Sequence, residues 1–153
     1  MRAHNFKEVA LGYSLEQAQL EASRCLQCKN PRCRQGCPVE VRIPEFIAQV
    51  VKGDIAEAYR ILKSTNSLPA VCGRVCPQEN QCEGILGVKG EPVAIGRLER
   101  FVADNAMHDP CVGVSDNDAC AVTNPDLKVA CIGSGPSSIT VAGYLAARGI
   151  KVT

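Results

Sequence analysis

The sequence predicts a mainly α-helical protein, with a helical domain over residues 1–106, a linker over 107–126 and the beginning of a strand-helix-strand unit over 127–153. Apolar residues recur at helical spacing up to residue 106. The stretch that follows is rich in Asp, Asn, Gly, Ser and Pro, which is typical of a linker. After it come an apolar strand, a glycine-rich turn and another helical pattern. Because a sheet of one or two strands is not independently stable, we expect the chain to be a fragment.

Four helices are expected in the first domain, and each is marked by a residue that suits its beginning: Ser14, Pro44, Asp54 and Pro92. Gln17 completes a capping box with Ser14. The first helix has an apolar stripe that extends to Leu26, and it leads directly into the first cysteines. Gly53 suits the end of the second helix. Cysteine-rich loops are expected before the second helix and over residues 69–90.

Composition and charge exclude several classes of partner. The chain has 17 Lys and Arg against 16 Asp and Glu, a net charge of +1 without a basic stripe, so no nucleic acid is expected. The uncharged stretch 129–147 is interrupted by Gly, Pro and Ser, so no membrane partner is expected either. No apolar signal segment follows Met1, and we therefore expect a cytoplasmic protein whose ten cysteines are reduced.

Seven of the cysteines form two motifs, C-x2-C-x4-C-x3-C-P over residues 25–38 and C-x3-C-P-x5-C over 72–82. Structural zinc usually takes two separated C-x2-C hooks. Four thiols within thirteen residues that end in Cys-Pro are more typical of iron–sulfur ligation, with zinc and unligated buried cysteine as alternatives. The candidate ligands are Cys25, Cys28, Cys33, Cys37, Cys72, Cys76 and Cys82.

Two [4Fe-4S] clusters need eight ligands, one more than these motifs supply. The other three cysteines lie in the linker and the predicted strand and are expected to be buried or incidental thiols; they are Cys111, Cys120 and Cys131. An eighth ligand is therefore of another kind, or one cluster is incomplete.

A possible nucleotide site lies in the second part of the chain. The pattern Gly133-x-Gly135-x-x-Ser138 follows the expected strand 127–132 and begins the expected helix 137–148, which is the context of a dinucleotide fingerprint. Gly133 permits a tight turn, and Gly135 lets the backbone approach a pyrophosphate at the helix N-terminus. By itself the pattern is equally typical of an ordinary strand-to-helix turn.

These motifs occur together in one order: the cysteine run 25–38, LPAVCGRVCPQE over 68–79, GEPVAIGRLERF over 90–101 and GSGPS over 133–137. Nearly the whole chain resembles the N-terminal part of the glutamate synthase small (β) subunit family. Its relatives include the N-terminal domain of dihydropyrimidine dehydrogenase and the large subunit of NADH-dependent ferredoxin:NADP oxidoreductase. The resemblance implies a helical domain with two [4Fe-4S] clusters, followed by Rossmann-like domains that bind FAD and NADPH.

The resemblance also implies roles for individual residues. It assigns Cys25, Cys28 and Cys33 to the first cluster. It assigns Cys37, Cys76 and Cys82 to the second, with Glu99 at the position of an unusual Gln or Glu ligand. It assigns the turn to FAD, through Gly133, Gly135, Pro136, Ser137 and Ser138.

The chain departs from the family at one position. The fourth cysteine of the first cluster is replaced by Leu86, and the segment 84–87 is shorter than in the family. Either Cys72 substitutes for it, or the first cluster is a three-cysteine site that is labile or takes an outside ligand.

The sequence therefore predicts an electron-transfer module of an NADPH-dependent oxidoreductase, resembling the glutamate synthase small subunit and not catalytically complete by itself. It would relay electrons between FAD and a partner subunit that contains flavin or iron–sulfur clusters, either like the glutamate synthase large subunit or linked to ferredoxin. No catalytic residue is expected, because electron transfer needs no general acid, base or nucleophile. The alternative is a zinc-stabilised or metal-free helical docking module without redox activity.

Overall fold

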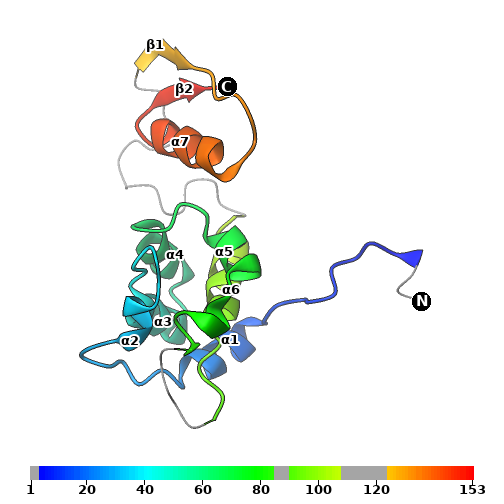
Figure 1. Ribbon diagram of the computed structural model, residues 1–153, viewed down its shortest axis with the longest axis vertical. Helices are drawn as coiled ribbons and strands as arrows, with labels where there is room; N and C mark the ends of the chain where they lie inside the picture. Colours follow the sequence, from blue (N-terminus) through cyan, green and yellow to red (C-terminus); the bar gives the residue numbers. More distant parts are fainter. Residues whose placement is uncertain (1–3, 85–89, 108–123) are drawn as a thin grey trace.

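The structure, a computed structural model, describes residues 4–84, 90–107 and 124–153. Its helices are α1 (Leu15–Ala22), α2 (Arg32–Gln35), α3 (Ile43–Lys52), α4 (Ile55–Lys63), α5 (Pro69–Val75), the short 3-10 helix η2 (Gln78–Asn80), α6 (Ile95–Ala106) and α7 (Pro136–Ala146). Its strands are β1 (Asn124–Val129) and β2 (Ile150–Val152). Figure 1 shows α1–α6 gathered in one helical body, and β1, α7 and β2 grouped together toward the C-terminus. The described chain is mainly α, as the sequence predicts.

The predicted capping residues begin and end three helices. At α1 the Ser14 side chain accepts a hydrogen bond from the Gln17 backbone N–H (3.3 Å), and Gln17 Oε1 accepts one from the Ser14 N–H (2.9 Å). At α4 the Asp54 Oδ1 accepts a bond from the Glu57 N–H (3.0 Å). Gly53 ends α3 with a φ of 80°, a left-handed conformation in which a side chain would be strained. These termini are determined locally.

Other boundaries differ from the prediction. Both α2 and α5 lie in stretches predicted to be loops, although Pro69 at the beginning of α5 is a helix-start signal. The fourth expected helix, α6, begins at Ile95 and not at Pro92. Because α1 ends at Ala22, Leu26 lies beyond it and is 83% exposed, so it is not part of a buried stripe.

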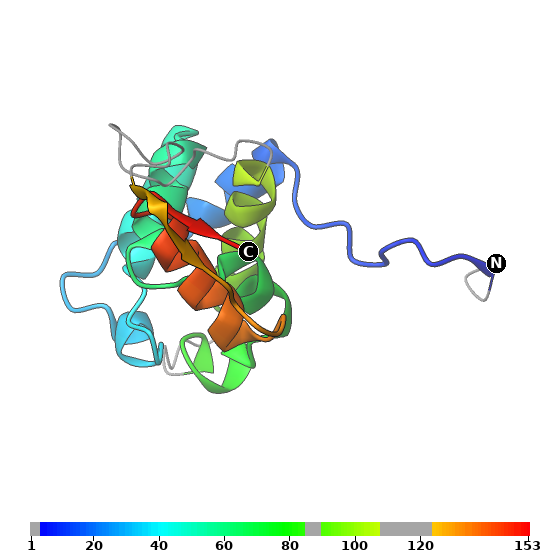
Figure 2. The ribbon, with the colours of Figure 1, turned by 90° about the horizontal axis from the view of Figure 1, so that it is seen from above.

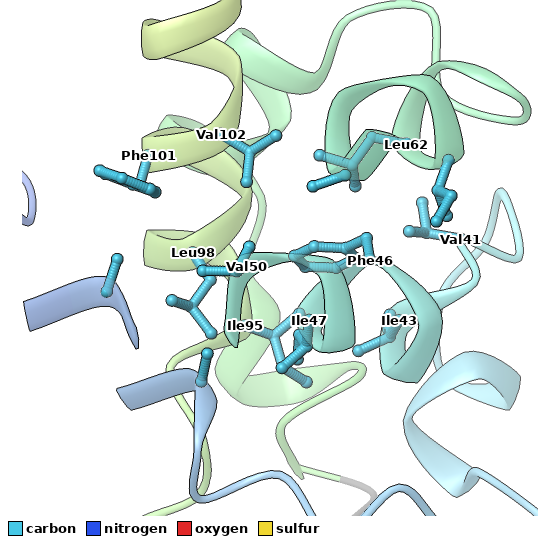
Figure 3. Close-up of a cluster of buried hydrophobic side chains, with 14 of the residues drawn as sticks. Val41, Ile43, Phe46, Ile47, Val50, Leu62, Ile95, Leu98, Phe101 and Val102 are labelled. Atoms are coloured by element: carbon cyan, nitrogen blue, oxygen red, sulfur yellow. The ribbon is translucent and has the colours of Figure 1, made fainter. Parts of the chain in front are cut away.

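The core of the helical body lies between α3, α4 and α6. Figure 3 shows their apolar side chains meeting in one cluster, in which the fully buried members are Ile43, Phe46, Ile47, Val50, Leu62, Leu98 and Val102. The small residues Ala18 and Ala22 let α1 approach this cluster closely. Helix α6 packs against α1, α3, α4 and α5. Helix α6 therefore contacts both α1, which precedes the first cysteine motif, and α5, which carries part of the second.

Residues 124–153 form a strand-helix-strand unit in which β1 and β2 are parallel neighbours. Figures 1 and 2 show the two strands side by side on one face of α7. The first strand begins at Asn124, earlier than the predicted residue 127, whereas the second begins at Ile150 as predicted. Gly149 is the one buried residue in this unit, while Ile132 and Tyr144 are exposed.

Candidate metal centre

Three cysteines of the first motif line a cavity of about 420 Å³ in the helical body. Cys25 follows the end of α1, Cys28 lies in the next loop, and Cys33 is carried by α2. The lining also includes apolar side chains from α3 and from the segment 92–95. Cys33 is buried, whereas Cys28 is exposed. The cavity therefore brings together the three thiols that the family resemblance assigns to one cluster.

The electrostatics of this cavity favour a cationic occupant. Burial raises the pKa of the Cys33 thiol, and the thiolate charges of Cys25 and Cys28 raise it further, against smaller lowering effects of backbone hydrogen bonds. Thiolates that are close together in an apolar cavity repel one another unless a cation lies among them. The irons of a cluster supply that positive charge.

One wall of the cavity is tied to α1 by a polar network. Arg24 Nη1 donates to Glu21 Oε1 (2.7 Å), and Arg24 Nη2 donates to the backbone carbonyl of Glu91 (2.5 Å). Glu21 Oε1 also accepts a bond from the backbone N–H of Ala94 (2.8 Å). The segment that precedes α6 is thereby held next to the residues that carry Cys25.

A second group of thiols joins the end of the first motif to the second motif. Cys76 follows α5, and Cys82 is only 6% exposed. Burial first, and the charges of Glu83, Cys37 and Cys76 after it, together raise the pKa of Cys82 to about 12. Cys37, Cys76 and Cys82 are therefore electrostatic neighbours although Cys37 is far from the other two in sequence. This is the second set that the resemblance implies.

Glu99 lies on α6, where its charge acts on the Cys72 thiol. Its side chain is held by Asn66, whose Nδ2 donates to Glu99 Oε1 at 2.6 Å, and both residues are buried. Burial raises the pKa of Glu99 to about 7, against the lowering effect of the Asn66 hydrogen bond. A buried carboxylate beside a thiol is an unusual feature of a helix, and its oxygens are of a kind that can bind iron.

Cys72 lies beside Glu99 and not in the cavity of the first set. Burial raises the pKa of the Cys72 thiol, and the charges of Glu99 and Cys37 add to this effect, against the hydrogen bond to Asn66. Its Sγ donates to Asn66 Oδ1 at 3.6 Å. Cys72 is therefore not among the residues that line the cavity of Cys25, Cys28 and Cys33.

Close packing of α5 on α6 positions the second group. A Cβ at Gly73 would lie 2.6 Å from the backbone N and 2.8 Å from the Cα of Arg100, so only glycine permits this approach. Further along, the buried Gln78 side chain covers Gly96 so closely that a Cβ there would lie within 2 Å of its amide. Gly73 lies in α5 directly after Cys72, and Cys76 is the first residue after this helix. The sequence did not point to Asn66, Gly73 or Gly96. A glycine inside the expected fourth helix was an available signal for Gly96, whereas Gly73 lay in a stretch expected to be a loop.

The donor sets fit iron–sulfur clusters better than a single ion. Among residues 4–84, 90–107 and 124–153, no three His, Cys, Asp or Glu side chains converge closely enough to hold one metal ion. Tetrahedral zinc needs four ligands around one atom, whereas a cubane spreads its ligands over four irons. No disulfide joins the cysteines within these ranges. The cysteines of both groups within these ranges are thus free thiols.

The glycine-rich turn lies between β1 and α7, as the fingerprint requires. Gly133 has a φ of 103°, which a side chain would strain. Gly135 is the N-cap of α7, and no atom lies within 4 Å of the position that its Cβ would take. Pro136 and Ser137 are exposed and Ser138 is half-buried, so the turn is open to a ligand.

Residues 2–111 match the protein family described as dihydropyrimidine dehydrogenase domain II, 4Fe-4S cluster. The chain belongs to this family. The resemblance inferred from the ordered motifs is thereby confirmed. Leu86, Cys111 and Cys120 lie outside the residues that the structure describes, and Cys131 follows β1 away from both thiol groups.

The chain is also similar to several curated proteins that are about three times as long. It is 41% identical over 152 residues to the glutamate synthase (NADPH) small chain of Halomonas elongata, covering 98% of this chain and 31% of that protein. It is 39% identical to the glutamate synthase (NADPH) small chain of Escherichia coli, covering 99% of this chain and 32% of that protein. It is 34% identical to the NAD-dependent dihydropyrimidine dehydrogenase subunit PreT of Escherichia coli, covering 87% of this chain and 32% of that protein. The chain therefore spans about a third of the length of these relatives. Within the described residues, no helix has the length and apolar character needed to cross a membrane.

Proposed function

We propose that residues 1–106 hold two [4Fe-4S] clusters and relay electrons in an NADPH-dependent flavoprotein oxidoreductase of the glutamate synthase small-chain type. The observation that carries this proposal is that three thiols line the cavity, whereas Cys37 and Cys76 lie close enough to Cys82 for their charges to act on it. The first group consists of Cys25, Cys28 and Cys33. The second consists of Cys37, Cys76, Cys82 and the carboxylate of Glu99.

When bound, the clusters supply one-electron carriers. The residues of the helical domain bind them, exclude water and tune their potentials. Apolar side chains of α3 and α6 surround the first cavity, which limits contact of its occupant with water. The oxygen of Glu99 would give the second cluster a ligand different from thiolate and hence a different potential.

Cys72 is the remaining candidate ligand, and we propose that it stays a thiol beside the second cluster. Its contact with Asn66 and its distance from the first cavity support this assignment. The first cluster is then a three-cysteine site with one iron open to an outside ligand. The sequence 84–90 contains no thiol or carboxylate that would replace the family's fourth cysteine.

The rest of the electron path belongs to the longer protein. Residues 127–153, after a linker over 107–126, begin a Rossmann-like domain in which the turn at Gly133 and Gly135 binds the FAD pyrophosphate. FAD accepts electrons from NADPH, and the clusters pass them to a partner subunit that contains flavin or iron–sulfur clusters. The names of the relatives support this assignment, because they include glutamate synthase small chains and a dehydrogenase subunit. A cytoplasmic location is part of the proposal.

The test is to prepare the protein anaerobically, reconstitute it with iron and sulfide, and measure iron and acid-labile sulfide per chain. We expect about eight irons and, after dithionite reduction, the interacting EPR signals of two clusters. Cys33→Ala and Cys82→Ala should each remove about half of the iron. Cys72→Ala is the matched control and should leave the iron content unchanged.

Two outcomes contradict the proposal. If Cys33→Ala and Cys82→Ala each leave the iron content close to that of the wild type, the thiols do not form two sites. If the protein retains zinc and takes up no iron, electron transfer is excluded, and the docking-module alternative replaces it. Mild oxidation offers a further check, because the iron of the first site that has no protein ligand leaves first, which converts that site to a [3Fe-4S] centre with its own EPR signal.

A further inference from the structure

Asn66 is a buried polar residue between α4 and α5 that no cysteine motif includes. It is 5% exposed, and its side chain contacts three different groups. Its Nδ2 donates to Glu99 Oε1 at 2.6 Å. Its Oδ1 accepts hydrogen bonds from the backbone N–H of Leu68 at 2.9 Å and from the thiol of Cys72 at 3.6 Å. The amide therefore uses both its donor and its acceptor.

These contacts determine which way the amide faces. Leu68 N–H and the Cys72 thiol are both donors, so only the oxygen of Asn66 can face them. The NH2 group must then point to the Glu99 carboxylate. Because Leu68 is the residue that precedes α5, the orientation is tied to the backbone and does not depend on one side chain.

We propose that Asn66 is a positioning residue for the second cluster, which holds Oε1 of Glu99 so that Oε2 faces iron and which keeps the Cys72 thiol out of the ligand set. This inference rests on the proposed function, since it assigns Glu99 as a ligand. A donor on one carboxylate oxygen draws electron density from the ligand, so it makes the oxygen at iron a weaker donor. Asn66 should thereby raise the reduction potential of the second cluster.

The first variants are Asn66→Leu and Asn66→Asp. Asn66→Leu keeps a side chain that branches at Cγ and removes every side-chain hydrogen bond. Asn66→Asp keeps an acceptor for Leu68 and Cys72 but removes the donor to Glu99, so it separates the positioning role from the support of α5. Asn105→Asp is the matched control, because it makes the same charge change at an exposed position on α6, outside the site.

The decisive variant is the exchange Asn66→Asp with Glu99→Gln. The introduced amide donates to the introduced carboxylate, and its carbonyl oxygen remains for iron. The exchange reverses the polarity of the hydrogen bond and keeps the summed charge of the pair. A merely structural role of Asn66 would not distinguish the exchange from Asn66→Asp alone.

The readouts are iron content, the EPR spectrum of the reduced second cluster and its midpoint potential by redox titration. We expect both single variants to lower the potential and shift the EPR signal that Cys82→Ala removes, and the exchange to restore both toward wild type. The inference is overturned if the single variants match Asn105→Asp, or if the exchange is no closer to wild type than Asn66→Asp. If a single variant loses the iron of the second cluster, the exchange must restore that iron, and failure to do so also overturns it.

Failure of the proposed function has a separate signature. It is visible in the wild-type protein and in Cys82→Ala before Asn66 is changed, as iron that is absent or does not depend on Cys82. Iron that is absent or independent of Cys82 would also overturn the inference about Asn66. A wild-type protein with two clusters and unaffected Asn66 variants refutes the inference alone.

Discussion

The close approach of α5 to α6 at Gly73 makes a specific prediction about Gly73→Ala. The new Cβ would lie 2.6 Å from the backbone N of Arg100 and 2.8 Å from its Cα and Cβ. Since carbon atoms pack best about 3.5–4.0 Å apart, α5 must move away from α6 by about 1 Å. The obstacle is mainly helix backbone, which cannot rotate aside as a flexible side chain would. The cost is that of overpacking, about 1–3 kcal/mol.

An opposing effect has to be compared with this cost. Alanine is a better helix former than glycine by about 1 kcal/mol, and Gly73 has no left-handed φ that would strain alanine. The clash should outweigh this gain, so we expect a net loss of about 1–2 kcal/mol in the free energy of unfolding. The displacement also separates Cys72 and Cys76 on the α5 side from Glu99 on α6, so the second cluster should be lost before the first.

The assay is urea unfolding of the apoprotein followed by circular dichroism, together with iron content after anaerobic reconstitution. Gly143→Ala is the matched control, because Gly143 lies in α7 with no atom within 4 Å of the added carbon. We expect this control to leave iron unchanged. A Gly73→Ala protein that is at least as stable as wild type and retains all its iron would refute the packing argument.

Three further predictions concern a cap, a pH dependence and the glycine-rich turn. Ser14→Ala removes the capping box of α1 and should lower the free energy of unfolding by about 1 kcal/mol, measured by urea unfolding, whereas Ser14→Asp should retain most of it. Asp104 is paired with Arg74 (2.8 Å) and Arg100 (3.3 Å); burial raises its pKa, but these hydrogen bonds and charges outweigh burial and lower it. The stabilisation from Asp104 is therefore present above its ordinary pKa of 3.8 and is lost as the pH falls through the lower folded value. Asp104→Asn should cost about 1 kcal/mol at pH 7. This cost should become smaller as the pH falls below 3.8, and a cost that stays constant there would contradict this pairing. In the full-length protein, Gly133→Val should strain the turn, which has a φ of 103°, and lower the FAD content measured by absorbance; unchanged flavin would argue against a role for this turn.

Local signals in the sequence determined much of the fold. Ser14 and Asp54 cap their helices through bonds to residues three positions on, and Gly53 and Gly133 adopt the positive φ values that glycine permits. Such features depend on neighbouring residues, so they can be predicted from sequence spacing. Helix α5 was missed although Pro69 marks its beginning, because the cysteines around it were read as a loop.

The cysteine spacing and the ordered motifs also determined the family and the kind of cofactor. The spacing by itself left open how the seven thiols are divided and which group supplies an eighth ligand. Only the tertiary structure decided that Cys72 lies beside Glu99 and outside the first cavity, and that Asn66 connects the two. The physical reason is that the Asn66–Glu99 contact joins residues 33 positions apart, and the geometry around Cys72 depends on how closely α5 packs on α6. The distance between α5 and α6 is determined by the contact of Gly73 with the backbone of Arg100. The periodicity of apolar residues in the sequence does not predict this contact.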